Sequence, residues 1–222
     1  MIIAIDGPSG AGKSTLGKML AKKLNLLYLD TGAMYRAVGL AVIETGADLK
    51  DETKVAEIAS NAVVELVGEP ESLQIFLNGR NVSAEIRTAE AGEAASIVSG
   101  VSKVRKILVE HQRTLGAAAE NGCVLDGRDI GTVVFPHADL KFFLTAQPES
   151  RARRRFAEDA AKGVLTTYER TLAEINQRDR RDSSRHDSPL TVAEDAVVID
   201  TSNLNLEQAF EQMIKIVGEK CQ

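Results

Sequence analysis

The stretch that decides the fold reads Gly7-Pro8-Ser9-Gly10-Ala11-Gly12-Lys13-Ser14. It fits the pattern G-x-x-x-x-G-K-[ST], in which the backbone N–H groups of a glycine-rich loop surround phosphate groups. Residues 2–5 before it are continuously apolar and predict a strand that is buried on both faces. Residues 14–24 after it carry apolar side chains at helical spacing with lysines between them, which predicts an amphipathic helix. The pattern requires this strand–loop–helix context, so we predict a phosphate-binding loop.

Each part of this loop has an expected role. Its glycines permit positive φ and let backbone N–H groups converge on an anion, and the dipole of the following helix adds to the attraction. We expect Lys13 to reach the β- and γ-phosphates of ATP and to act in catalysis, and the hydroxyl of Ser14 to ligate Mg²⁺. The predicted ATP-binding residues are Gly7, Pro8, Ser9, Gly10, Ala11, Gly12, Lys13, Ser14 and Thr15.

The rest of the chain alternates between predicted strands and helices. Strands are expected at 26–29, 123–125, 140–144 and 196–199, and helices from 31 onward and at 89–98, 101–119, 148–162, 166–181 and 206–217. Two alternating apolar runs, 63–67 and 73–77, are joined by a Gly-Glu-Pro turn and predict a small β-rich insertion. This order predicts an α/β P-loop fold of three layers with a mostly parallel central sheet, in a single domain spanning 1–222.

Composition limits the kinds of partner and the cellular compartment that we expect for this chain. The chain has 222 residues and a formal net charge of −5, which argues against general binding of nucleic acid. Cys123 and Cys221 are far apart and lack metal-binding spacing, which favours a reducing compartment, and we expect a cytoplasmic protein. No apolar run is long enough to cross a bilayer, so we expect no membrane partner. We expect a monomer.

Binding of a triphosphate does not decide what happens to it. The sequence has no Asn-Lys-x-Asp segment, with which a GTPase would recognise guanine. It also has no apolar run that ends in Asp-Glu, which a motor ATPase would normally contain. A kinase that acts on a phosphorylated acceptor must instead neutralise clustered negative charge, for which guanidinium groups are suited. The candidates are Arg36, Arg128, Arg178 and Arg185. Arg128 is the strongest of them, because it follows a buried strand, where α/β folds bind ligands.

Four further arginines, at positions 151, 153, 154 and 155, lie on one predicted helix. The favoured interpretation is a solvated helix face. The alternative is a helix of a mobile lid that closes over the triphosphate, with Gly163 as a hinge.

The sequence resembles a known family, the bacterial cytidylate kinases, which are related to the adenylate kinases. The resemblance spans nearly the whole chain and rests on residues 5–15, 29–36, 85–88, 126–136 and 178–185. It implies transfer of a phosphoryl group from ATP to CMP or dCMP, an acceptor-binding region with the β-rich insertion at roughly 31–100, and a helical lid at roughly 151–185.

The resemblance also implies roles for individual residues. Arg36, Arg128 and Arg185 would hold the acceptor phosphate, with Arg178 near the transferring group. Ser96, Arg105 and Asp129 would read cytosine, and Tyr35 and Asp182 would position the sugar. The implied acceptor-binding set is Thr31, Tyr35, Arg36, Ser96, Arg105, Arg128, Asp129, Arg178, Asp182 and Arg185, of which Arg128, Arg178 and Arg185 also act in catalysis.

Two other functions remain open from sequence. One is a small P-loop kinase for adenylate, shikimate or another nucleotide, which a screen of acceptors would separate. The other is a regulatory module that uses ATP only as a switch, whose signature would be tight ATP binding without acceptor-dependent turnover.

Overall fold

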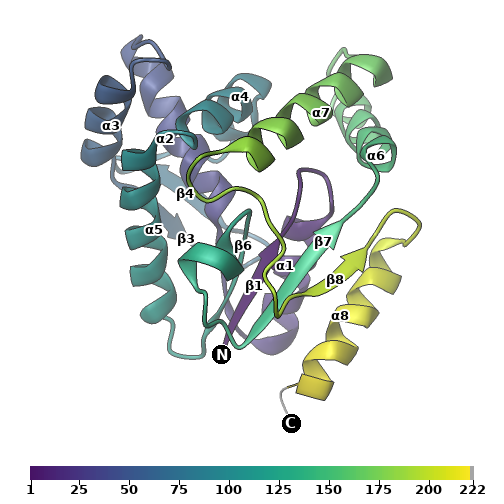
Figure 1. The fold of residues 1–222 in the computed structure, drawn as a ribbon. Helices are drawn as coiled ribbons and strands as arrows, with labels where there is room; N and C mark the ends of the chain where they lie inside the picture. Colours follow the sequence, from purple (N-terminus) through teal and green to yellow (C-terminus); the bar gives the residue numbers. More distant parts are fainter. Residues whose placement is uncertain (221–222) are drawn as a thin grey trace.

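The computed structural model describes residues 1–220 and shows a five-stranded parallel sheet at the centre of the chain (Figure 1). The strands are β1 (Ile2–Asp6), β2 (Leu27–Asp30), β6 (Cys123–Gly127), β7 (Leu140–Thr145) and β8 (Val197–Asp200). Their order across the sheet is β2-β6-β1-β7-β8, and every neighbouring pair is parallel. The predicted fold class is confirmed. Cys221 lies outside the described residues.

Alternation along β1 explains the layers. Ile3 and Ile5 face one side of the sheet, where they pack in a cluster with helices α1 (Lys13–Leu24) and α8 (Leu206–Lys220). Ala4 faces the other side and packs with α5 (Ser102–Ala117) and the short π-helix η2 (Ile130–Val134). Because both faces of the strand are covered, its residues are apolar throughout.

A second core lies beside this sheet. Helices α2 (Thr31–Thr45), α3 (Glu52–Asn61) and α4 (Ala89–Val98), with the short turn η1 (Glu85–Arg87), pack around an antiparallel sheet of β3 (Val64–Val67), β4 (Gln74–Leu77) and β5 (Arg80–Asn81). The β-rich insertion is therefore confirmed. Helix α3 was not predicted, although Asp51 caps it by accepting a hydrogen bond from the Lys54 N–H.

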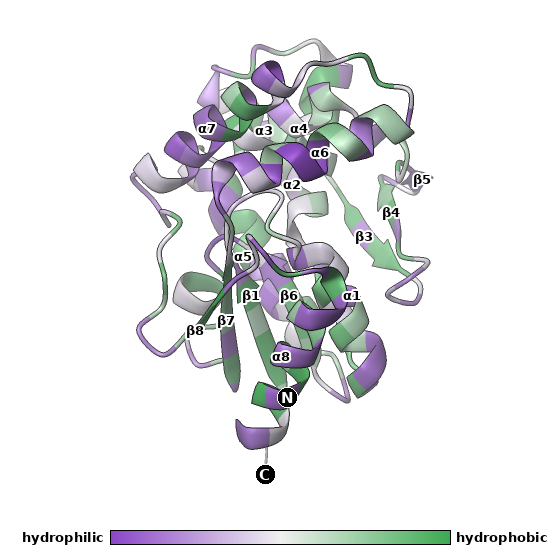
Figure 2. Ribbon diagram, turned by 90° about the vertical axis from the view of Figure 1, so that its right-hand side faces the viewer, coloured by the Kyte–Doolittle hydropathy of each residue, from purple (hydrophilic) through white to green (hydrophobic). Residues whose placement is uncertain are grey.

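Helices α6 (Pro148–Ala161) and α7 (Tyr168–Ser184) lie across the carboxyl ends of the strands, and they contain many hydrophilic residues, whereas the strands of the central sheet are mainly apolar (Figure 2). Gly163, between them, has a φ of 73° and open space around it. Helix α7 continues past the predicted end at 181 and so includes Asp182. None of the helices within residues 1–220 is long and apolar enough to span a bilayer.

Candidate active site

The phosphate-binding loop leaves β1 at its carboxyl end and enters α1 at Lys13. Gly7 has a φ of 145°, and a Cβ added there would lie 1.9 Å from the carbonyl oxygen of Leu144. Only glycine therefore fits at this turn. Gly12 caps α1 without any side-chain hydrogen bond, so the first N–H groups of the helix stay available to an anion.

Lys13 and Ser14 are held by neighbouring oxygens. The Lys13 ammonium donates a 2.8 Å hydrogen bond to the carbonyl of Pro8, and the Ser14 hydroxyl donates a 2.7 Å bond to Oδ2 of Asp126, at the end of β6. Burial, together with Arg128 nearby, lowers the pKa of Lys13 well below its usual value. A bound anion would oppose this shift in the pKa of Lys13, because negative charge beside an ammonium stabilises its protonated form.

Asp126 is buried between three hydroxyl-bearing neighbours. Its Oδ1 accepts a 2.8 Å hydrogen bond from the Tyr28 hydroxyl, while Thr31 donates a 2.7 Å bond to its backbone carbonyl. Burial, and then the charge of Asp30, raises the pKa of Asp126. The hydroxyl of Thr31, a predicted acceptor-binding residue, therefore donates its hydrogen bond to the backbone of β6 in this structure.

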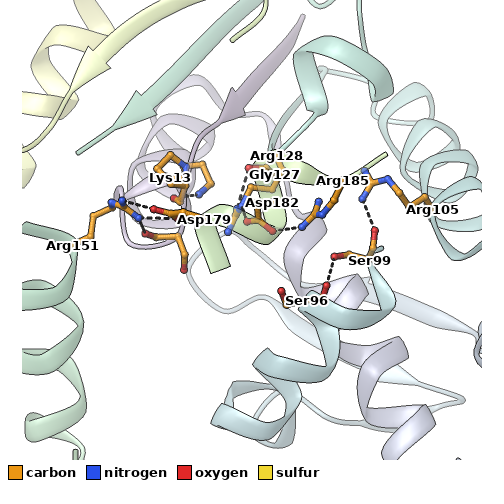
Figure 3. A network of polar contacts seen from close by, with 12 residues as sticks. Lys13, Ser96, Ser99, Arg105, Gly127, Arg128, Arg151, Asp179, Asp182 and Arg185 are labelled. Atoms are coloured by element: carbon orange, nitrogen blue, oxygen red, sulfur yellow. Dashed lines mark hydrogen bonds and ion pairs between the residues drawn. The ribbon is translucent and has the colours of Figure 1, made fainter. Parts of the chain in front are cut away.

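The predicted phosphate-binding arginines meet at a shared carboxylate. Asp182 on α7 accepts a 2.8 Å hydrogen bond from Nε of Arg128 and a second bond from Arg185. Burial alone would raise the pKa of Asp182, but these two guanidinium groups hold the pKa below its usual range. Burial and the neighbouring Arg128 lower the pKa of Arg178 to about 10, and its Nε has no hydrogen-bond partner among the described residues. In Figure 3, Arg128, Asp182 and Arg185 lie between Lys13 and Arg105.

Arg36 belongs to the same region. Its side chain reaches back to the start of α2, where its Nη2 lies 3.0 Å from Oδ2 of Asp30. The other oxygen of Asp30 caps α2 by accepting from the Ala33 N–H.

The residues expected to read the base form a second group. Arg105 on α5 pairs with Asp129 and donates a 3.1 Å hydrogen bond to the carbonyl of Ser99, and its guanidinium lies 5.5 Å from the ring centre of Tyr35. The hydroxyls of Ser96 and Tyr35 are buried, and within residues 1–220 they have no hydrogen-bond partner. Buried hydroxyls without partners are costly, so a ligand that bonds them would be favoured here.

One cleft of about 570 Å³ joins the loop to the arginines. It is lined by residues 9–16 on one side and by Arg36, Arg128 and Arg178 on the other. Thr201 and Asn205, between β8 and α8, extend it beyond the loop. A volume in this range suits a small-molecule ligand.

The favoured interpretation of the four arginines on α6 was wrong for two of them. Arg151 is buried and pairs with Asp179 of α7, and Arg154 donates to the backbone and side chain of Thr201. Arg155 lines the cleft and pairs with Asp159, while Arg153 is exposed. Helix periodicity places a side chain on a face, but it cannot reveal that α7 and the β8–α8 connection cover that face.

Sequence reasoning also missed three aspartates. Asp126 and Asp30 line the cleft, and Asp6 accepts from two backbone N–H groups of η2. A signal was present, because each one ends an apolar run that forms a parallel strand. Ligands bind at this edge of such sheets.

Fold and site together define the class: this is a P-loop kinase, in which a phosphate loop and a group of arginines line one cleft. Within that class the chain belongs to the cytidylate kinase family, whose model matches residues 3–219. A cytidylate kinase from Geobacter sp. is 48% identical over 99% of this chain and 94% of its own. One from Carboxydothermus hydrogenoformans is 46% identical over 99% and 98%.

A solved structure of an uncharacterized protein from Eubacterium ventriosum matches with a TM-score of 0.53 at 12% identity and covers 98% of both chains. This likeness supports the overall fold alone.

Proposed function

We propose that this chain transfers the γ-phosphoryl group of ATP to CMP and dCMP, which yields ADP with CDP or dCDP. The observation that carries the proposal is the single cleft in which the phosphate loop faces Arg36, Arg128 and Arg178. Cationic groups on both sides of one cleft suit two phosphorylated molecules held end to end. Membership of the cytidylate kinase family supports CMP and dCMP as the nucleotides that accept the phosphoryl group.

The base-reading group supports cytosine. A carboxylate such as Asp129 accepts from the exocyclic amine of cytosine, and a guanidinium such as Arg105 donates to the ring carbonyl. Uracil would turn a carbonyl toward Asp129 and leave two acceptors opposed, which a buried site rejects strongly. The hydroxyls of Ser96 and Tyr35 are further partners for the acceptor, and Asp182 is suited to its sugar.

Mg²⁺ fits the oxygens beside the loop. Ser14 and Asp126 present a hydroxyl and a carboxylate 2.7 Å apart, which are the hard ligands that this ion prefers. Among residues 1–220 there is no group of three or more His, Cys, Asp or Glu side chains that could hold a metal. The ion would therefore complete its shell with water and phosphate oxygens, and when bound it neutralises charge on the triphosphate.

The reaction needs positioning of the two substrates and neutralisation of their negative charge more than it needs a general base, because an oxygen of the acceptor phosphate is already nucleophilic. Lys13 and the loop amides would hold the γ-phosphoryl group. Arg128 and Arg185 would hold the acceptor phosphate once the nucleotide displaces Asp182 as their partner. Arg178, whose Nε has no partner among the described residues, would stabilise the charge that develops on the transferring group.

We further propose that residues 31–100 form the acceptor-binding region and that residues 151–185 form a lid that closes on ATP. We propose a cytoplasmic monomer whose partners are ATP and CMP or dCMP, without nucleic acid. Sedimentation of the purified protein tests the monomer.

A screen of acceptors tests the reaction. Turnover of ATP should depend on CMP or dCMP, and it should be at least about 100-fold less efficient with AMP, UMP or shikimate, because each leaves base-reading groups unpaired. Comparable turnover of AMP and CMP would refute the cytosine assignment. Tight ATP binding without turnover of any acceptor would instead indicate a regulatory module.

Lys13→Ala tests the loop. The substitution should lower kcat about 100-fold or more, because a transition-state charge contact is lost. Near-normal turnover would remove Lys13 from the mechanism.

A further inference from the structure

Arg151 is a buried guanidinium on a helix whose other three arginines are less buried or exposed. Its side chain is only 3% exposed. Burial of a charge is costly unless every donor finds a partner, so a buried arginine in a charged helix calls for an explanation.

Its donors join three elements. Nε donates a 2.8 Å hydrogen bond to the carbonyl of Ala146, after β7. Nη1 donates a 3.2 Å bond to the carbonyl of Ser9 in the phosphate loop. Nη1 and Nη2 also donate to Oδ1 and Oδ2 of Asp179 on α7, at 3.0 and 2.6 Å respectively. Figure 3 shows this bidentate contact. A planar fork with several fixed donors can make these contacts at once, whereas an ammonium cannot reproduce them.

The contact with Ser9 fixes the direction of an amide. The carbonyl of Ser9 and the N–H of Gly10 belong to one planar trans peptide unit, in which the two groups point in opposite directions. A carbonyl held from behind by Arg151 therefore aims the Gly10 N–H away from Arg151. Gly10 also packs against this side chain, because a Cβ added to it would lie 3.2 Å from Cβ of Arg151.

The rest of the loop is held in the same way. Thr201 donates a 3.1 Å hydrogen bond to the carbonyl of Ala11, and Lys13 binds the carbonyl of Pro8. Three of the four carbonyls of residues 8–11 thus accept a hydrogen bond from a side chain, which leaves the N–H groups of the same peptide units to the ligand. Arg151 supplies the one tie that comes from the proposed lid.

The contact with Asp179 reaches the transferring group. Asp179 directly precedes Arg178 on α7, so the ion pair fixes the helix turn from which Arg178 enters the cleft. We propose that Arg151 is a positioning residue: it aims the Gly10 amide at the triphosphate and, through Asp179, holds Arg178 over the loop. This inference rests on the proposed kinase function.

Two conservative variants separate the two contacts. Arg151→Lys keeps the charge but loses the fork, so the KM for ATP should rise about 10-fold and kcat should fall about 10-fold or more, because small misplacements cost catalysis heavily. Asp179→Asn keeps the Ser9 contact, so kcat should fall about 10-fold while the KM for ATP changes less than about 2-fold. Because Arg128 and Arg185 would still hold the acceptor phosphate when Arg178 is displaced, the dissociation constant for CMP alone should stay within about 3-fold of that of the unsubstituted chain in both variants.

The exposed ion pair Arg170–Glu174 on α7 provides matched controls, Arg170→Lys and Glu174→Gln. These should leave kcat and both KM values unchanged. A purely structural role for Arg151 would lower the melting temperature and leave the kinetics of the folded protein unchanged, which would overturn the proposal.

Amide hydrogen exchange gives a readout that does not depend on turnover. Peptides covering residues 7–14 should exchange faster in Arg151→Lys than in Arg170→Lys, at a temperature where both are folded. Equal exchange in the two variants would overturn the proposal even if the unsubstituted chain failed to phosphorylate CMP. Faster exchange in an inactive chain would support the positioning role and refute the proposed function alone.

Discussion

At the scale of single residues, Asp6 is a buried carboxylate held by backbone N–H groups. It lies at the end of β1 and accepts hydrogen bonds of 2.8 and 2.7 Å from Ile130 and Gly131. Burial raises its pKa to about 6; the nearby charge of Asp129 acts in the same direction, while the two N–H groups and Lys13 oppose the shift. The residue thereby fixes the start of η2, next to Asp129.

This raised pKa predicts a pH-dependent stability. The folded state binds the proton of Asp6 more tightly than the unfolded state, in which the pKa of this carboxyl group is near its ordinary value of 3.8. The stabilisation from Asp6 is therefore present at low pH and is lost as pH rises through the folded pKa, at about 1 kcal/mol between about pH 5 and pH 7. Urea unfolding at both pH values measures it.

Asp6→Asn is the control for that titration. Its free energy of unfolding should change less between the two pH values than that of the unsubstituted chain, by about 1 kcal/mol. Parallel pH profiles for the two proteins would contradict the assignment to Asp6.

Asp129→Asn tests the reading of the base. An amide both donates and accepts, so it can face either the amine of cytosine or the carbonyl of uracil. We expect the ratio of kcat/KM for CMP over UMP to fall at least about 10-fold, since the unpaired acceptor that excludes uracil is removed. Steady-state assays with both nucleotides measure the ratio, and an unchanged ratio would place the discrimination elsewhere.

At the scale of elements, the predictable parts are those with a strong local pattern. Helix α4 was predicted with its observed bounds, because its small residues are bracketed by a Thr88 cap and a Gly100 turn. The π-helix η2 could not be predicted, since its turn is fixed from outside by Asp6, which is 124 residues away from Ile130. The burial of Arg151 was hidden for the same reason: its partners come from other elements.

The site divides along the same line. The loop could be read from its own residues. The arginines could be named as candidates because guanidinium groups suit phosphate binding, and the resemblance assigned their individual roles, which stay predictions. Their shared dependence on Asp182 could not be read from the sequence. It arises because α7 extends to Ser184 and brings Asp182 between Arg128 and Arg185.

The close packing of α2 on α4 yields a prediction at this scale. A Cβ added to Gly39 would lie 2.9 Å from the backbone nitrogen of Ala95 and 3.0 Å from Cβ of Ala94. Gly39→Ala should therefore push α4 outward and cost about 1–3 kcal/mol of stability. Because α4 carries Ser96, the KM for CMP should also rise, while the KM for ATP should not.

Gly92→Ala on α4 is the matched control. An added Cβ there meets no atom within 4 Å, so the substitution should be neutral or should stabilise the helix by up to about 1 kcal/mol. Thermal unfolding and steady-state kinetics measure both variants. Equal effects of Gly39→Ala and Gly92→Ala on stability and on the KM for CMP would contradict a role for the spacing between α2 and α4.

At the scale of the whole molecule, an ion pair links the proposed lid to the proposed acceptor-binding region. Arg181 on α7 binds both oxygens of Glu93 on α4, each at 2.8 Å. The two side chains are 29% and 54% exposed, so the pair contributes less than about 1 kcal/mol. A contribution that small cannot stabilise the fold appreciably, but it can shift an equilibrium between open and closed arrangements several-fold.

Glu93→Gln should accordingly leave the melting temperature nearly unchanged and favour the open arrangement when no nucleotide is bound. Small-angle scattering should show a larger radius of gyration for the variant without ligand, and the same radius for both proteins when ATP and CMP are bound, because the ligands then supply the closing contacts. Salt should expand the unsubstituted chain toward the variant, since partly exposed pairs are screened. Glu57→Gln, which breaks an exposed pair within α3, should change neither radius. If Glu93→Gln and Glu57→Gln scatter alike without ligand, the ion pair does not bias closure, and the contact between α4 and α7 is incidental to it.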